Sequence, residues 1–150
     1  MVILKTIFFE LVLKLVPVFV VLYLASFLLS LFQKRNTEVI NSKVEELKKQ
    51  MRGERLFIAD SVESPDRGSV QFFGEPFNVS IGPGMTLIDL DGREHRIEEV
   101  YLKDDTPDVP DPAISSGMKN CALLIKSDNF DLDKAMLEIE KNIVVGFKIK

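Results

Sequence analysis

Four aspartates stand close together in a proline-rich segment, and clustered carboxylates are the ligands that Ca²⁺ prefers. They are Asp104, Asp105, Asp108 and Asp111 in the run DDTPDVPDP. Aspartate and proline are also the ordinary composition of a solvated loop, because both residues favour turns over regular structure. We expect a solvated loop here, and a Ca²⁺-binding or enzymatic domain that uses its acidic loops remains an alternative.

A second acidic pattern has the spacing of a calcium-binding loop, with Asn129, Asp131 and Asp133 at its first, third and fifth positions. Glu140 falls at the twelfth position, but Lys134 occupies the sixth, where the sharp turn of such a loop requires glycine. No helix–loop–helix pattern surrounds it. We therefore expect a polar turn that caps a short helix.

The chain has one histidine and one cysteine, which excludes a disulfide scaffold, a Cys/His zinc cluster and a CxxC redox motif. His95 has no serine or cysteine nucleophile arranged around it, so a surface histidine is expected. Cys121 opens an apolar run and is expected to pack as a small hydrophobe. No phosphate-binding GxxxxGK[ST] loop occurs. The sequence predicts no catalytic residue, no metal, no cofactor and no enzyme.

Residues 15–32 form an uncharged run of 18 residues, which as a helix spans about 27 Å, close to the hydrocarbon thickness of a bilayer. Thirteen of them are Leu, Val or Phe, and these favour insertion by about 4–8 kcal/mol. A cleaved signal peptide or a buried core helix would be alternatives; the run lacks an A-x-A-like cleavage site, and the 97 residues after Gly53 are too few to cover a helix on every side. We predict a transmembrane helix within residues 1–33, with residues 1–14 spanning or lying at the interface. The residues that represent the span are Leu15, Val18, Phe19, Leu22, Leu29 and Phe32.

The net charge of −4 conceals two unlike parts. Residues 1–53 carry eight basic and four acidic residues, for a net +4, whereas residues 54–150 carry eleven basic and nineteen acidic residues, for a net −8. Six cations follow the apolar run and two precede it, a bias that favours the C-terminal part in the cytoplasm. The tripeptide Asn78-Val79-Ser80 has the form of a glycosylation sequon, which matters only if that part is extracytoplasmic. The expected localisation is single-pass in the membrane.

Residues 34–53 predict a short juxtamembrane helix that ends at Gly53. Ile40, Val44, Leu47 and Met51 follow one another at alternating steps of four and three, which places them on one face. This seam is compatible with a stalk that self-associates, and equally with an amphipathic helix that packs on the following domain or lies on lipid.

After Gly53 the pattern changes to short β-like runs separated by turn residues, typical of a small antiparallel β-barrel in residues 54–150. The expected strands are residues 55–62, 69–75, 78–81, 85–90, 94–102, 121–125 and 143–148. Asp91-Gly92 predicts a hairpin turn, Gly74 predicts a bulge or a close backbone approach, and residues 129–142 contain a helical turn. The fold class is therefore mainly β, preceded by helices.

The order of these elements resembles the β-barrel second domain of translational GTPases such as elongation factor Tu. The resemblance rests on Arg67-Gly68-Ser69-Val70, on Gly74-Glu75, and on the step from Val79 through Ile81-Gly82-Pro83-Gly84-Met85 to Leu87; looser matches are Cys121-Ala122-Leu123-Leu124 and Glu138-Ile139-Glu140. It covers about residues 56–150 and implies a barrel used as a binding or docking module. The phosphate loop of that family is absent, so nucleotide hydrolysis is not implied. In the family this barrel helps to hold aminoacyl-tRNA or contacts ribosomal RNA, but nucleic-acid surfaces are normally basic and this segment carries −8.

Phe72 and Phe73 are adjacent on an expected strand, so their rings point to opposite faces. One is expected in the core, and the other either contacts a partner, the preferred interpretation, or is covered by the loop. Together these features predict a non-enzymatic membrane protein that docks other proteins through its barrel. The expected partners are the lipid bilayer and a protein or a second copy held through the stalk, with neither nucleic acid nor a small-molecule substrate. A membrane-tethered RNA- or ribosome-associated factor is the alternative of a different class.

Overall fold

The computed structural model describes residues 1–102 and 110–150. These residues divide into two compact units, Met1–Val39 and Ile40–Lys150, which are described separately below.

The first unit is formed by the N-terminal part of helix α1 (Val2–Gln50). Pro17 is the only glycine or proline before Gly53, so nothing in the sequence interrupts the helix between residues 18 and 50. The separate juxtamembrane helix expected for residues 34–53 is accordingly not present, because α1 passes through this segment without a break. The helix ends where Gly53 adopts a φ of +85°, a conformation that costs glycine little and other residues more.

Every residue from Met1 to Val39 is exposed. Within α1 an 18-residue window has a mean hydropathy of 2.5, and none of that window is buried. By length and composition, this helix can cross a membrane. A surface helix of a globular protein normally buries one apolar stripe, whereas here all sides are apolar and uncovered.

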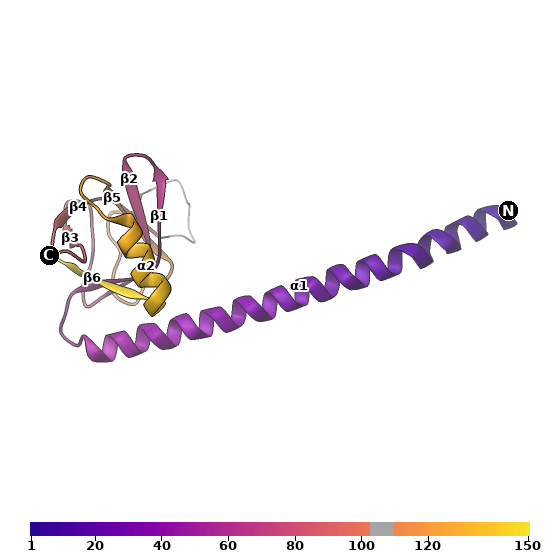
Figure 1. The fold of residues 1–150 in the computed structure, drawn as a ribbon, viewed down its shortest axis with the longest axis horizontal. Helices are drawn as coiled ribbons and strands as arrows, with labels where there is room; N and C mark the ends of the chain where they lie inside the picture. The colour runs from indigo at the N-terminus through magenta and orange to yellow at the C-terminus, as the bar shows by residue number, and fades with distance from the viewer. Residues whose placement is uncertain (103–109) are drawn as a thin grey trace. The chain divides into compact units, whose positions relative to one another are not determined.

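The second unit contains a closed antiparallel β-barrel (Figure 1). Among the described residues its strands are β1 (Leu56–Asp66), β2 (Ser69–Phe77), β3 (Thr86–Ile88), β4 (Glu94–Leu102), β5 (Cys121–Lys126) and β6 (Val145–Ile149). Their order around the barrel is β1-β2-β5-β4-β3-β6, and β6 returns to pair with β1 from Leu56↔Lys148 to Ala59↔Val145. The mainly β, antiparallel barrel predicted from the strand pattern is therefore confirmed.

Two expected strands differ most from the structure, while the others are shifted at their ends by no more than two residues. Residues 78–81 do not form a strand; Asn78 has a φ of +57°, and Ile81 makes an isolated bridge with Ile114 through hydrogen bonds of 2.7 and 2.8 Å. Strand β1 extends through Pro65 to Asp66, so the turn between β1 and β2 consists of Arg67 and Gly68. Proline is tolerated there because the register with β2 is irregular between Glu63 and Asp66.

Gly74 marks a close approach between the backbones of β1 and β2, as the sequence predicted. It pairs with Ala59, next to a bulge of β1, and a Cβ atom added to Gly74 would lie 1.9 Å from the carbonyl oxygen of Ile58. No side chain of any size fits at this distance. The glycine therefore allows the two strands to cross tightly at the bend.

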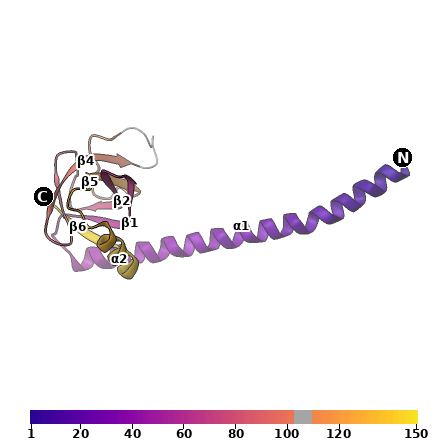
Figure 2. The same cartoon turned by 45° about the horizontal axis from the view of Figure 1, so that its top comes forward.

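The barrel interior is filled by aromatic and aliphatic side chains. Phe72 lies at its centre, with its ring edge-on to Phe147 at 5.0 Å and to Phe130 at 5.3 Å between centroids. Helix α2 (Leu132–Asn142) lies beside the barrel (Figure 2), and its buried side chains Ala135 and Ile139 belong to the same core cluster as Phe72 and Phe147. Asp131 caps this helix by accepting a hydrogen bond of 3.0 Å from the Lys134 N–H, which confirms the predicted polar turn.

Candidate functional site

The last turns of α1, from Ile40 onward, pack against the outside of the barrel. The seam residues Ile40, Val44, Leu47 and Met51 form one apolar cluster with Leu56, Ile58, Phe77, Ile143 and Val144. Val44 is only 6% exposed. Of the arrangements that the sequence allowed for this seam, the structure therefore shows the helix packed on the following domain.

An ion pair fixes the same helix turn to strand β2. The Lys48 ammonium group contacts the carboxylate of Glu75, lies 3.1 Å from the carboxylate of Glu45, and stands 5.9 Å from the ring centroid of Phe77. Glu75 is buried, so the contact with Lys48 offsets the cost of removing its carboxylate from water. Partial burial lowers the pKa of Lys48, but the hydrogen bonds and charges of Glu75 and Glu45 outweigh it and hold that pKa above its ordinary value.

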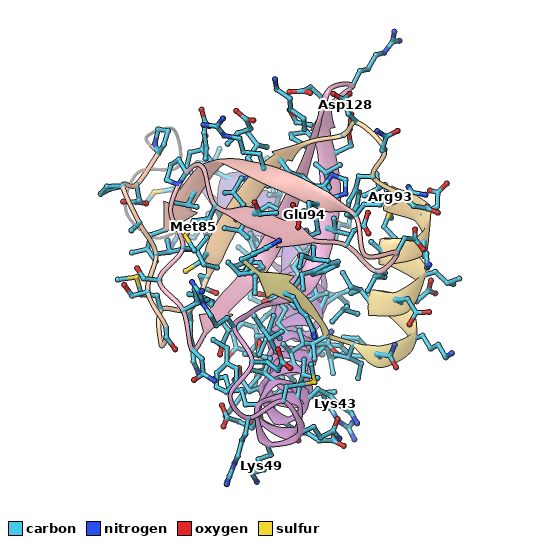
Figure 3. The ribbon with its side chains drawn as sticks, turned by 90° about the vertical axis from the view of Figure 1, so that its left-hand side faces the viewer. Lys43, Lys49, Met85, Arg93, Glu94 and Asp128 are labelled. Atoms are coloured by element: carbon cyan, nitrogen blue, oxygen red, sulfur yellow. The ribbon has the colours of Figure 1, made fainter. Side chains whose placement is uncertain are left out.

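A groove of about 380 Å³ lies beside this packed helix. Lys43, Glu46 and Gln50 form one wall, Glu138 and Asn142 of α2 form the other, and Gly146 of β6 lies at the base. Figure 3 shows Lys43 and Lys49 at this end of the domain, away from Asp128. The groove offers charged groups of both signs and side-chain amides, and no nucleophile with an adjacent base.

A buried His–Asp pair occupies the loop between β3 and β4. His95 and Asp89 are both buried, and the imidazole Nε2–H donates to Asp89 Oδ2 over 2.8 Å. The expectation of a surface histidine is wrong, because His95 pairs with Leu87 across β3 and β4 and turns its ring inward. That ring stands edge-on to Phe130, with 5.4 Å between centroids.

Asp89 organises the whole loop. Its Oδ1 atom accepts the backbone N–H groups of Asp91 at 2.9 Å and Arg93 at 2.8 Å. Burial by itself would raise the pKa of Asp89, but the hydrogen bonds from His95, Arg93 and Asp91 outweigh it and lower that pKa below its ordinary value. Arg93 in turn donates to the Asn129 carbonyl at 2.8 Å, and Figure 3 shows Arg93 beside α2. The pair thus joins the β3–β4 loop to the start of α2.

The acidic motifs do not assemble a metal centre among the described residues. Asp131 is engaged as the cap of α2, and Lys134 contacts Asp91 instead of leaving an open coordination site. Asp111 Oδ2 accepts the Leu102 N–H at 2.6 Å. Asp104, Asp105 and Asp108 lie outside the described residues.

The two phenylalanines of β2 point to opposite faces, as expected from strand geometry. Phe72 is fully buried in the barrel core, whereas Phe73 is half-buried on the other face. Cys121 is fully buried and packs in the core, as predicted for a small hydrophobe. The six residues that represent the expected span are all exposed on α1; they are Leu15, Val18, Phe19, Leu22, Leu29 and Phe32.

Sequence reasoning missed the buried His–Asp pair and the Lys48–Glu75 ion pair. The alternation around His95 was a usable signal for the first, because Ile97 lies two residues further along the same strand and points inward. No local signal marks Glu75, whose partner lies in a different element. No protein-family model, no curated protein and no solved structure matches this chain.

Proposed function

We propose that this chain is a single-pass membrane protein without enzymatic activity, whose acidic β-barrel is a docking and assembly module of a membrane complex. The observation that carries this proposal is the exposed apolar part of α1, with a mean hydropathy of 2.5 over 18 residues and no covered side. In water such a surface would aggregate, whereas in a bilayer its exposure is favourable.

The distribution of charge supports the orientation and the type of partner. The cations that follow the apolar run support a cytoplasmic location of the barrel. Residues 54–150 carry a net charge of −8, which complements a basic protein surface and repels nucleic acid. The resemblance to the second domain of translational GTPases remains part of this proposal, as a barrel used for binding without a nucleotide site.

Two surfaces of the folded domain are candidates for this docking. The groove between α1 and α2 offers charged groups of both signs, and Phe73 offers a half-buried ring on the outer face of β2. Leu137, which precedes the groove residue Glu138 on α2, is 61% exposed. These features give a protein partner both apolar and polar contacts, as protein interfaces commonly combine.

The membrane anchor is tested by washing native membranes with alkaline carbonate. The full chain is expected to stay in the pellet, and its recovery in the soluble fraction contradicts the proposal. Leu22→Arg, in the middle of the apolar run, should lower insertion by about 3 kcal/mol in apparent free energy. The matched control is Leu90→Arg, a substitution of an exposed leucine of the barrel unit, which should leave the chain in the pellet.

The docking role is tested by affinity purification of the full chain from native membranes at increasing salt. A partner with a basic surface should co-purify at low ionic strength and dissociate as salt screens the charges. Co-purification of ribosomes that survives moderate salt would instead favour the RNA-associated alternative.

A further inference from the structure

A polar stripe crosses the otherwise apolar N-terminal turns of α1. Thr6, Glu10 and Lys14 are spaced four residues apart, so they lie on one face of the helix. Nine of the twelve residues from 2 to 13 are large and apolar, and all twelve are exposed. Every residue of the unit Met1–Val39 is exposed.

Because of the length of α1, neither lipid nor water alone provides a favourable environment for both the apolar side chains and the charged side chains of these turns. Lys14 and Lys34 are 20 residues apart, which corresponds to about 30 Å and matches the hydrocarbon thickness of a bilayer. With these lysines at the two interfaces, the turns before Lys14 project apolar side chains out of the hydrocarbon region. If the helix instead slides to bury these turns, Glu10 and Lys14 enter hydrocarbon, where a charge requires a partner.

Among the described residues, no ion pair reaches Glu10 or Lys14. Glu10 and Lys14 form no ion pair with each other in the structure, although Lys43–Glu46 and Lys48–Glu45 do so on later turns of the same helix. Pro17 lies on the same face as the stripe, and because proline lacks an N–H it withholds the donor that the Leu13 carbonyl would receive in a regular helix. This face therefore presents an acid, a base and a backbone acceptor.

We propose that a second copy of this chain covers the stripe, and that the two α1 helices pair in parallel with Glu10 of each helix facing Lys14 of the other. This inference rests on the proposed membrane anchor. Two copies inserted with the same orientation can pair only in parallel, and a two-fold contact requires that each residue meet its complement on the partner. An acid and a base four residues apart on one face meet this requirement.

The folded domain explains why the pairing uses this stripe and not the seam near the barrel. Ile40, Val44, Leu47 and Met51 are packed on Leu56, Ile58 and Val144, so the seam is occupied within one chain. An exposed site for helix pairing is left in the N-terminal turns. Polar contacts between membrane helices stabilise association because their alternative is an unpaired group in lipid.

The test measures energy transfer between full-length chains labelled at the N-terminus with donor or acceptor and reconstituted in phosphatidylcholine vesicles. Wild type should dimerise. Glu10→Lys or Lys14→Glu alone places like charges opposite each other and should weaken association about tenfold. The double variant Glu10→Lys/Lys14→Glu restores the complementary pattern and should recover wild-type association. Lys5→Glu, on the other side of the helix, is the matched control and should associate as wild type does.

Three results would overturn the pairing. These are a monomeric wild type in vesicles, equal association of all variants, or failure of the double variant to recover. Carbonate extraction of the same samples separates this inference from the membrane anchor. A chain that stays in the membrane but remains monomeric refutes the pairing alone, whereas a chain that leaves the membrane refutes both proposals.

Discussion

At the scale of single residues, the buried Asp89–His95 pair shows how one carboxylate can hold a loop in place. Asp89 accepts two backbone N–H groups and the imidazole N–H, and this set of donors is what keeps its pKa low despite burial. A group whose pKa is lower in the folded state stabilises the fold above its unfolded pKa, and this contribution is lost as the pH falls through the folded pKa.

Asp89→Asn should therefore destabilise the domain by about 1–3 kcal/mol at neutral pH, because the amide replaces one hydrogen-bond-accepting oxygen by an NH₂ donor. The difference from wild type should begin to shrink below about pH 4, where the carboxyl of the unfolded chain becomes protonated, and should be lost as the pH falls through the lowered pKa of folded Asp89. Urea unfolding of the full chain in detergent, followed by circular dichroism between pH 7 and pH 3, measures both effects. A pH-independent difference would show that the Asp89 charge is not involved.

Lys48 is the second residue whose environment determines its role. Lys48→Met should destabilise the domain by about 1–3 kcal/mol, because Glu75 stays buried without its cation. Lys43→Met is the matched control: it removes an exposed i,i+3 pair with Glu46 and should change stability by less than about 1 kcal/mol. Because the pKa of Lys48 is raised, its contribution should persist at neutral pH and disappear only as the pH rises through that pKa. Equal effects of the two variants in the same unfolding assay would contradict this reading.

At the scale of secondary-structure elements, the close crossing of β1 and β2 at Gly74 limits what the barrel tolerates. Gly74→Ala places a Cβ atom 1.9 Å from the Ile58 carbonyl oxygen, so the strands must separate locally. We expect a destabilisation of about 3 kcal/mol, at the upper end of overpacking effects. Gly68→Ala is the matched control, since its added Cβ meets nothing closer than 3.6 Å, and it should change the melting temperature little. If the Gly74→Ala variant has the same melting temperature as wild type, β1 and β2 can separate at this point without a loss of stability.

Helix α1 illustrates how one element can belong to two environments. Its residues from Val2 to Val39 are exposed, whereas its last turns contribute the seam that packs on the barrel. The seam has two short heptads, which is little for a stable coiled coil but enough to cover Leu56 and Ile58. The pattern of seam residues predicts a buried face, and the side chains that cover it come from the barrel unit.

At the scale of the whole molecule, the charge asymmetry predicts the topology. If the cations after the apolar run stay in the cytoplasm, protease added to sealed vesicles with the cytoplasmic face outward should digest the barrel. In vesicles of the opposite orientation the barrel should be protected. In a cell that glycosylates exported proteins, Asn78 should stay unmodified although it is exposed, and its modification would contradict this topology.

The sequence by itself determined the features that depend on neighbouring residues. An unbroken apolar run predicts the long N-terminal helix, Gly53 predicts where α1 ends, and alternation with turn residues predicts an antiparallel barrel. Asp131 predicts the start of α2 because a cap acts on its own helix turn. In each case the stabilising interaction lies within a few residues, so composition and spacing contain the information.

Only the tertiary structure decided which faces are covered. The burial of His95 depends on Phe130 and Asp89, the burial of Glu75 on Lys48, and the closure of the barrel on pairing between β1 and β6. These partners are 6 to about 90 residues apart in the chain, and apart from the alternation around His95 no local pattern marks them. Burial is a property of the assembled core, so the same Val44 and Leu47 that could pair with a second helix are instead packed on the barrel.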